Sequence, residues 1–356
     1  MKLQQTIRAH LSFFIFMALA TVASAAEPPT HMEMVQAVID KHIIPHVDAL
    51  KDAAARLPDA VGNVCTTGSA AANEELSRRF RKAVEAYAGV DFLRFGPMLE
   101  GGLRERISFW PDPRGFVDRQ LRLILLSKDE AILKDGAIAK QSVAVQSLPA
   151  LEALMQDKNV PLGPGEAAHY RCEVAKAIAA NVANVAGEIA NRWEKPGGWK
   201  DKMLKPGPDN DTYKDASESA GELVKALLTG LSLTADLQLK PHIDAKSKLP
   251  GPFEKSGLRS AFFEANVESL KSFYDALGIE AYLPADKAWM KGWVTGAWRA
   301  AESSDGLGGR APDAQRSDAP PIREVFDKMN GLRRLINSQM CPAAKLSVGF
   351  NELDGD

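Results

Sequence analysis

The chain has 356 residues, of which 45% are hydrophobic and 25% charged, with a formal net charge of −2. This length is enough for two domains or one elongated domain, and the near-neutral charge argues against nucleic acid or an anionic membrane surface as a partner. Aromatic residues make up only 7% of the chain and alanine is abundant, so helices are favoured over strands.

The first 25 residues have the pattern of a secretory signal peptide. Lys2 and Arg8 precede an apolar run from Leu11 to Val22, and Ala23-Ser24-Ala25 supplies small residues at a cleavage site. The run is short for a membrane span, and no later segment is apolar enough for one. We therefore expect a mature protein that starts near Ala26 and is soluble in an oxidising periplasm, with no membrane insertion after signal cleavage.

The first half of the mature chain predicts a bundle of four helices joined up-down-up-down, residues 26–196. Gly89 to Gly136 is rich in Gly and Pro and predicts a long irregular connection with one short helix at 117–127. Pro45 predicts a bend in the first long helix. The four long helices are expected at 32–60, 71–88, 136–156 and 166–193.

Residues 195–215 predict a linker, and a second helical bundle follows at 216–356. The stretch Leu227–Leu233 loosely echoes Val143–Leu154, which suggests that the two bundles arose by duplication. The chain closes with an acidic tail that includes Asp354 and Asp356. The expected helices of the second bundle are 216–239, 259–277, 287–301 and 322–338. The fold class is therefore all-α, with two up-down four-helix bundles.

Three cysteines, Cys65, Cys172 and Cys341, are too far apart in the sequence for a zinc motif. In an up-down bundle the end of the first helix and the start of the fourth meet at the same pole. We therefore predict a disulfide between Cys65 and Cys172, which leaves Cys341 free.

The expected helix at 136–156 contains an inward-facing carboxylate. Val145, Leu148 and Met155 share one stripe of the helix, and Glu152 lies on the same stripe. Pro149 should kink the helix. A buried carboxylate needs a partner, and Arg171 lies at a comparable depth on the next antiparallel helix, so a Glu152–Arg171 ion pair is predicted.

Other candidate residues carry weaker signals. His42 and His46 are four residues apart on the first helix and could share a metal, although Pro45 distorts that spacing. Arg94, Trp110 and Asp112 lie in the long irregular connection, where they flank a pocket or form loop-packing contacts. The sequence contains no G-x-S-x-G, H-E-x-x-H or phosphate-binding glycine loop.

Several segments together resemble the imelysin-like proteins. They are Arg94-Phe95-Gly96-Pro97, Phe109-Trp110-Pro111-Asp112, Ser142 to Glu152 and the closing Gly349 to Asp356. That family includes imelysin, described as an insulin-cleaving metallopeptidase, iron-regulated protein A and the periplasmic component of a ferrous-iron uptake system. The resemblance implies a duplicated four-helix-bundle fold with a pocket between the bundles.

The family's proposed metal motif, G-x-H-x-x-E, matches this chain only at Glu152. Ser147 stands at the glycine position and Pro149 at the histidine position, and proline offers no ligand. The resemblance therefore favours a non-catalytic periplasmic binding or accessory protein linked to iron acquisition, with components of an iron-uptake system as partners. Its expected ligand-binding residues are Arg94, Trp110, Asp112, Gln146 and Glu152, with Glu152 the candidate metal ligand. A small ligand, a divalent metal or iron could be bound.

Two alternatives remain open. One is a metallopeptidase of the imelysin type that uses ligands other than the missing histidine. The other is a purely structural helical bundle in which the Glu152–Arg171 pair fixes the helix register.

Overall fold

The computed structural model describes residues 27–244, 246–247, 249–303 and 321–346, and these contain helices but no strands. The all-α class is thus confirmed. The predicted signal peptide at 1–25 and the acidic tail lie outside the described residues. None of the described helices is long and apolar enough to cross a membrane.

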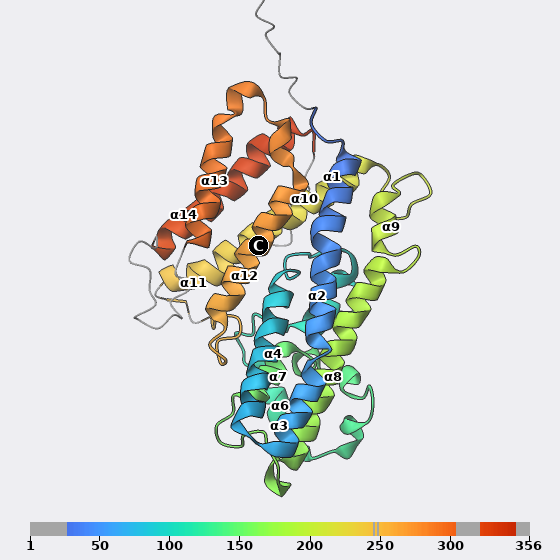
Figure 1. The fold of residues 1–356 in the computed structure, drawn as a ribbon, viewed down its shortest axis with the longest axis vertical. Helices are drawn as coiled ribbons and strands as arrows, with labels where there is room; N and C mark the ends of the chain where they lie inside the picture. Colours follow the sequence, from blue (N-terminus) through green and yellow to red (C-terminus); the bar gives the residue numbers. More distant parts are fainter. Residues whose placement is uncertain (1–26, 245, 248, 304–320, 347–356) are drawn as a thin grey trace, which may run out of the picture.

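An N-terminal lobe is built around long helices that pack side by side (Figure 1). Helices α2 and α3 follow each other along one side and pack against both α4 and α8. Shorter elements cover the remaining face, and α7 lies between α6 and α8. The elements of this lobe are α2 (Ile44–Ala54), α3 (Leu57–Thr67), α4 (Ala70–Ala88), η2 (Gly96–Leu99), α5 (Leu103–Ile107), α6 (Phe116–Ser127), η3 (Glu130–Leu133), η4 (Ile138–Lys140), η5 (Val143–Val145), α7 (Leu148–Met155) and α8 (Glu166–Glu194).

A C-terminal lobe is formed mainly by the second half of the chain (Figure 1). The first helix, α1 (His31–Val38), also belongs here, because it packs against α10 and α12. Between the lobes, α9 (Trp199–Leu204) contacts α1, α8 and α10. The elements of this lobe are α10 (Ala216–Leu233), η6 (Thr234–Leu239), α11 (Lys240–Ile243), α12 (Arg259–Leu277), η7 (Ile279–Tyr282), η8 (Ala285–Lys287), α13 (Trp289–Glu302), α14 (Ile322–Leu335), η10 (Ile336–Met340) and α15 (Cys341–Ala343).

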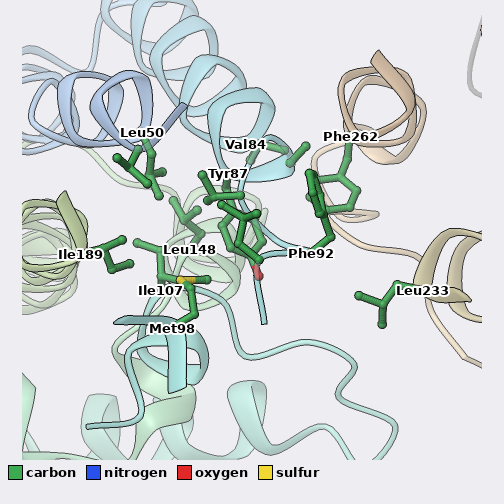
Figure 2. Packing of buried hydrophobic residues seen from close by; sticks show 14 of the residues in the cluster. Leu50, Val84, Tyr87, Phe92, Met98, Ile107, Leu148, Ile189, Leu233 and Phe262 are labelled. Carbon is green, nitrogen blue, oxygen red and sulfur yellow. The ribbon is translucent and has the colours of Figure 1, made fainter. Parts of the chain in front are cut away.

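One hydrophobic core runs through both lobes. Buried residues of both lobes belong to one cluster, and Figure 2 shows part of it, with Leu50, Leu148 and Ile189 of the N-terminal lobe toward the left and Phe262 and Leu233 of the C-terminal lobe toward the right. Gly230 is needed where α10 passes the chain after α4, since a Cβ there would lie 2.8 Å from the Cβ of Phe92. The lobes therefore form one body and are not separated by a flexible linker.

The expected helix at 136–156 does not exist as one element. The chain makes two short 3₁₀ turns, η4 and η5, and α7 begins only at Leu148. Pro149 lies in the first turn of α7, where its missing N–H would have no helical partner in any case. The predicted mid-helix kink is therefore wrong, because the proline starts the helix and does not interrupt it.

Proline has a different role at three other places in the chain. The residue before Pro45, Pro241 and Pro342 donates its N–H to the carbonyl five residues back, so each proline follows a π-helical turn. The first of these turns is η1 (Ile39–Ile43). A π turn moves the carbonyl that would clash with the proline ring. The bend expected at Pro45 thus takes the form of a wider helical turn.

Two of these π turns share a sequence pattern that indicates an internal repeat. Residues 40–48 and 236–244 both read Asp-x-x-x-x-Pro-His-Val/Ile-Asp. In each, the π turn leads into a helix that begins just before the proline. The weaker echo between Val143–Leu154 and Leu227–Leu233 has no such structural match, because the first stretch includes a 3₁₀ turn and the second is continuous helix.

Candidate functional site

Glu152 is the buried carboxylate of helix α7, and it contacts the C-terminal lobe. Its side chain is only 4% exposed. The Oε1 atom accepts hydrogen bonds from the backbone N–H of Ser256 at 2.8 Å and from the Ser256 hydroxyl at 2.6 Å. Burial raises the pKa of Glu152, and the two hydrogen bonds from Ser256 and the charge of Lys255 oppose that rise. Glu152 therefore ties the two lobes together.

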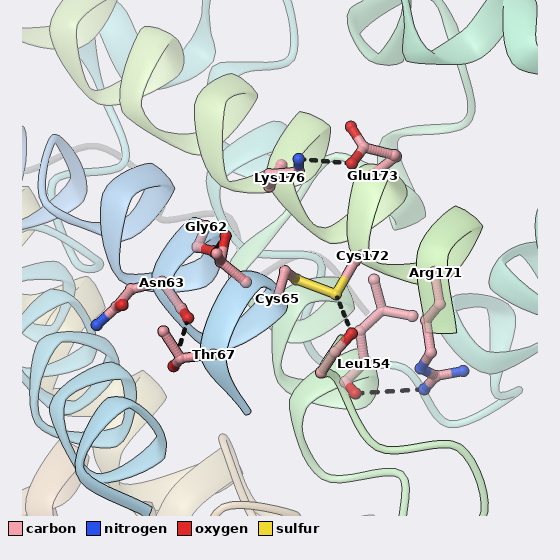
Figure 3. The surroundings of a disulfide bond; sticks show 11 residues. Gly62, Asn63, Cys65, Thr67, Leu154, Arg171, Cys172, Glu173 and Lys176 are labelled. Atoms are coloured by element: carbon pink, nitrogen blue, oxygen red, sulfur yellow. Dashed lines mark hydrogen bonds and ion pairs between the residues drawn. A yellow bond between two sulfur atoms is a disulfide. The ribbon is translucent and has the colours of Figure 1, made fainter. Parts of the chain in front are cut away.

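Arg171 does not pair with Glu152, so the predicted ion pair is wrong. Its guanidinium donates to Asp157 at 3.0 Å and to the carbonyl oxygen of Leu154 at 3.3 Å, the latter visible in Figure 3. The prediction assumed a full-length helix, whereas α7 is short and Arg171 lies beside its last turn. The alternative of a structural bundle fixed by a Glu152–Arg171 pair is ruled out with it.

Gln146, another expected ligand-binding residue, is fully engaged inside the protein. Its Oε1 accepts from the Nε of Arg106 at 2.9 Å. Its Nε2 donates to two backbone carbonyls, those of Ala139 and Gln141. The side chain is 2% exposed. These bonds hold together the turns that precede α7, so Gln146 positions the helix that carries Glu152.

The other three expected residues are spread along the irregular connection. Asp112 caps helix α6, because its two carboxylate oxygens accept from the N–H groups of Phe116 and Val117, both at 2.9 Å. The indole N–H of Trp110 donates to the carbonyl of Pro250 at 3.1 Å. Arg94 lies near the buried Tyr87, where its positive charge opposes the rise in the pKa of that phenol. The structure does not gather the five residues into one pocket.

The segment 249–258, between α11 and α12, links several of these residues. Its Pro250 carbonyl accepts a hydrogen bond from the indole N–H of Trp110, and its Lys255 forms an ion pair with Asp118 of α6. Ser256 in turn donates to Glu152. Phe253 of the same segment packs its ring against those of Phe80, Tyr87 and Phe262. Sequence reasoning missed this segment; its only signal was the run Pro250-Gly251-Pro252.

A cleft of about 630 Å³ lies beside this contact, between α6, α7 and the start of α8. Lys255 is its one lining residue from the C-terminal lobe. Apolar and charged side chains both line it: Asp118, Leu121, Arg122, Leu125, Leu126, Ala153, Leu154, Gln156, Asp157, Asn159, Arg171 and Lys255. Glu152 is on the same helix as Ala153 and Leu154, but it is turned toward Ser256.

The residues around Glu152 do not fit a metal centre. Pro149, which stands where the family motif has histidine, has no donor atom, and Oε1 of Glu152 already accepts two hydrogen bonds. Lys255 brings a positive charge close to the carboxylate. Across the described residues, no group of three or more His, Cys, Asp or Glu side chains is arranged to hold a metal ion.

His42 and His46 are stacked, with ring centroids 3.9 Å apart, and do not converge on a common ligand position. His42 is fully buried, and its Nε2 lies 3.3 Å from the carbonyl oxygen of Gly89. Burial, together with the charge of His46, lowers the pKa of His42 to about 3. A neutral imidazole that bonds a backbone carbonyl is a packing element of the core.

A disulfide joins Cys65 at the end of α3 to Cys172 near the start of α8, the pair expected from the helix order (Figure 3). The two cysteines are 107 residues apart in the sequence. Cys341 is a buried free thiol, and burial raises its pKa to about 11. Such a thiol is unreactive at neutral pH.

The Imelysin family model, of the M75 peptidase class, matches residues 43–306. The chain belongs to the imelysin family. The matched region includes α7 with Glu152, the disulfide and the segment 249–258. Within this imelysin-family chain the histidine position of the motif is Pro149. No curated protein matches the chain.

Two crystal structures share the fold of this imelysin-family chain. An imelysin-like protein from Psychrobacter arcticum is 17% identical, has a TM-score of 0.69 and covers 90% of this chain and 97% of its own. A protein from Parabacteroides distasonis, described as an iron-regulated protein A precursor, is 13% identical, has a TM-score of 0.65 and covers 90% and 96%. At these identities the likeness establishes the fold alone.

Proposed function

We propose that this chain is an exported, non-catalytic member of the imelysin family that serves iron acquisition in the periplasm as a binding or accessory protein. The observation that carries the proposal is the state of Glu152. Its histidine partner in the family motif is replaced by Pro149, and its Oε1 atom is occupied by two hydrogen bonds from Ser256. A carboxylate held in this way supports the junction of the lobes.

Two observations support export. Lys2, Arg8, the apolar run from Leu11 to Val22 and the small residues at 23–25 have the order of a secretory signal. The disulfide between Cys65 and Cys172 suits an oxidising compartment, because such bonds are rare in the reducing cytosol. The link to iron is drawn from the relative described as an iron-regulated protein A precursor.

A cleavage assay tests the non-catalytic part of the proposal. The purified mature chain is incubated with unfolded peptide substrates, with and without a chelator, beside Glu152→Gln. We expect no cleavage above the buffer control in any arm. Chelator-sensitive cleavage that is lost in Glu152→Gln would overturn the proposal and favour the metallopeptidase alternative.

The cellular part is tested in the source bacterium by fractionation and by deletion of the coding sequence. We expect the protein in the periplasmic fraction, shortened by about 25 residues as the cleavage-site pattern predicts. Growth of the deletion strain should slow under iron limitation and recover when excess iron is supplied. Full-length protein in the cytosol, or growth that does not depend on iron supply, would contradict export and the iron link respectively.

A further inference from the structure

The cleft between α6, α7 and the start of α8 has the size of a small-molecule site, at about 630 Å³. Five of its lining residues are charged, and four of them neutralise one another in pairs. Lys255 forms an ion pair with Asp118, and Arg171 forms one with Asp157. Arg122 of α6 is the fifth charged residue, which leaves the lining with one excess positive charge.

Arg122 has no protein partner in the part of the chain that the structure describes. Its side chain makes no ion pair, hydrogen bond or ring contact with any described residue and is exposed to the cleft. A guanidinium presents donors in a planar fork that matches a carboxylate. Arg122 is therefore a free anion-binding group at the cleft wall.

Arg171 lines the same cleft, and the protein does not fully satisfy the hydrogen bonds and the charge of its guanidinium. The residue is 7% exposed, and its buried Nε has no hydrogen-bond partner among the described residues. Its one carboxylate partner, Asp157, has a side chain that is 31% exposed. Buried charged donors are normally all satisfied, so an anion in the cleft would add compensation that the protein alone does not supply.

An apolar wall lies next to Arg122. Leu121, Leu125 and Leu154 line the cleft, and Leu126 is 74% exposed, more than any other large hydrophobic side chain in the described ranges. Leu126 and Arg122 are four residues apart on α6, so they are neighbours on the same helix face. The cleft thus presents a free cation and an exposed aliphatic surface side by side.

We propose that this cleft binds a carboxylate that carries an aliphatic group. Arg122 pairs with the carboxylate, Leu125 and Leu126 cover the aliphatic part, and Lys255 brings the C-terminal lobe to the edge of the bound molecule. The same chemistry is found in a small acylamino acid and in the C-terminal leucine of a peptide. This inference rests on the proposed binding role and names the ligand class for it.

Calorimetric titration of the full mature chain tests the ligand class. The probes are N-acetyl-L-leucine, its amide N-acetyl-L-leucinamide, acetate and the peptide N-acetyl-Ala-Ala-Ala-Leu. We expect the two leucine carboxylates to bind at least about tenfold more tightly than the amide or acetate, because a charge-assisted pair and the aliphatic contact are both required. Tighter binding of N-acetyl-L-leucine than of the peptide would indicate a small acylamino acid as the natural ligand. Tighter binding of the peptide would indicate a peptide C-terminus.

Paired variants test the residues. Arg122→Gln should weaken N-acetyl-L-leucine binding about tenfold. Arg119→Gln is the control, because Arg119 lies on the same helix, rests over the Phe116 ring and does not line the cleft. Binding should also weaken as salt rises.

Equal affinity for the acid and the amide, unchanged affinity in Arg122→Gln, or no binding of any probe at about 10 mM would overturn the inference. None of these results bears on the cleavage assay. Conversely, chelator-sensitive proteolysis would overturn the proposed function and leave the ligand class of the cleft to be judged by the titration.

Discussion

Among the polar contacts that join the lobes, two differ clearly in burial and in charge. The inner contact centres on Asn266 of α12, which donates to the carbonyl of Ala88 and accepts from Thr234 and Gln238. The outer contact is the one between Glu152 and Ser256, at the edge of the cleft. The inner contact is neutral and buried, whereas the outer one carries an ionisable group beside charged side chains.

The difference in burial suggests different roles, stability for the inner contact and ligand binding for the outer one. Residues in the inner contact are at most 1% exposed, as Asn266 and Gln238 are, and none of them lines the large cleft. Through Asn266, its hydrogen bonds connect α12 to the end of α4 and to the π turn η6. The outer contact is the only one of the two that solvent or a ligand in the cleft can influence. We therefore expect mutations in the inner contact to change stability and mutations around the outer contact to change binding.

Asn266→Ala should cause the largest loss of folding stability. It removes the partner of the Ala88 carbonyl and of the Gln238 amide, while the Thr234 hydroxyl keeps the Gly230 carbonyl as an acceptor. Unfolding should therefore become easier by roughly 3 kcal/mol. The measurement is urea denaturation followed by circular dichroism. Asn330→Ala is the control, because among the described residues the Asn330 amide bonds to Phe326 of its own helix and to no other group. A similar small loss in both variants would show that the inner contact does not hold the lobes.

His42→Gln should abolish a pH dependence of stability. The pKa of His42 is lowered to about 3, so between that pH and its unfolded pKa the unfolded chain binds more protons than the folded one. Stability should therefore rise with pH over this window, by about 3 kcal/mol between pH 4 and pH 6.5. Glutamine is the residue that the internal repeat has at the matching position, Gln238.

Denaturant midpoints measured across that pH range check this prediction. The exposed His169 provides the control, and His169→Gln should keep the wild-type slope. If His42→Gln also keeps that slope, the charge state of His42 does not set the pH dependence of stability.

Ser256→Ala should have a smaller effect at the outer contact. Glu152 loses the hydroxyl donor but keeps the backbone N–H of residue 256, so the loss of stability should be about 1 kcal/mol. The pKa of Glu152 should rise further because one of the bonds that favour its ionised form is gone. NMR titration of the labelled carboxyl group measures this shift. An unchanged titration would mean that the hydroxyl bond is absent in solution.

Glu152→Gln should change stability least, by less than about 0.5 kcal/mol near pH 7. The amide oxygen can still accept from Ser256, and the buried charge is removed. Since the folded pKa of Glu152 is raised, the folded state holds this proton more tightly than the unfolded chain does. Ionisation above the ordinary pKa of glutamate therefore lowers wild-type stability, and the variant should gain relative to wild type as pH rises.

Much of the fold could be predicted from the sequence, because it follows from apolar periodicity and strong helix boundaries. The 3.6-residue pattern located α4, α8, α10, α12 and α14 close to their observed bounds. It failed at 136–156, where the same apolar pattern fits a chain of 3₁₀ turns. Pro149 indicated the start of a helix at this point, since proline is tolerated in the first turn of a helix far more easily than in its interior.

The candidate site was harder to predict, because its partners come from distant parts of the chain. Glu152 was identified as a buried carboxylate that needs a partner, but Ser256 is 104 residues away and a serine in a loop has no periodic signal. Arg171 was correctly expected to be buried, and its partner Asp157 lies in the turn that the sequence assigned only as a break. The burial of a helix residue can be predicted from apolar periodicity, whereas the partner that a short helix turns it toward depends on tertiary packing.

Metal analysis of the protein purified from its native compartment, beside Glu152→Gln, tests the central claim that α7 is a structural and pocket helix and not a metal centre. We expect wild type and variant to carry the same metal content under identical purification. One equivalent of a divalent metal in the wild type that is lost in Glu152→Gln would contradict it.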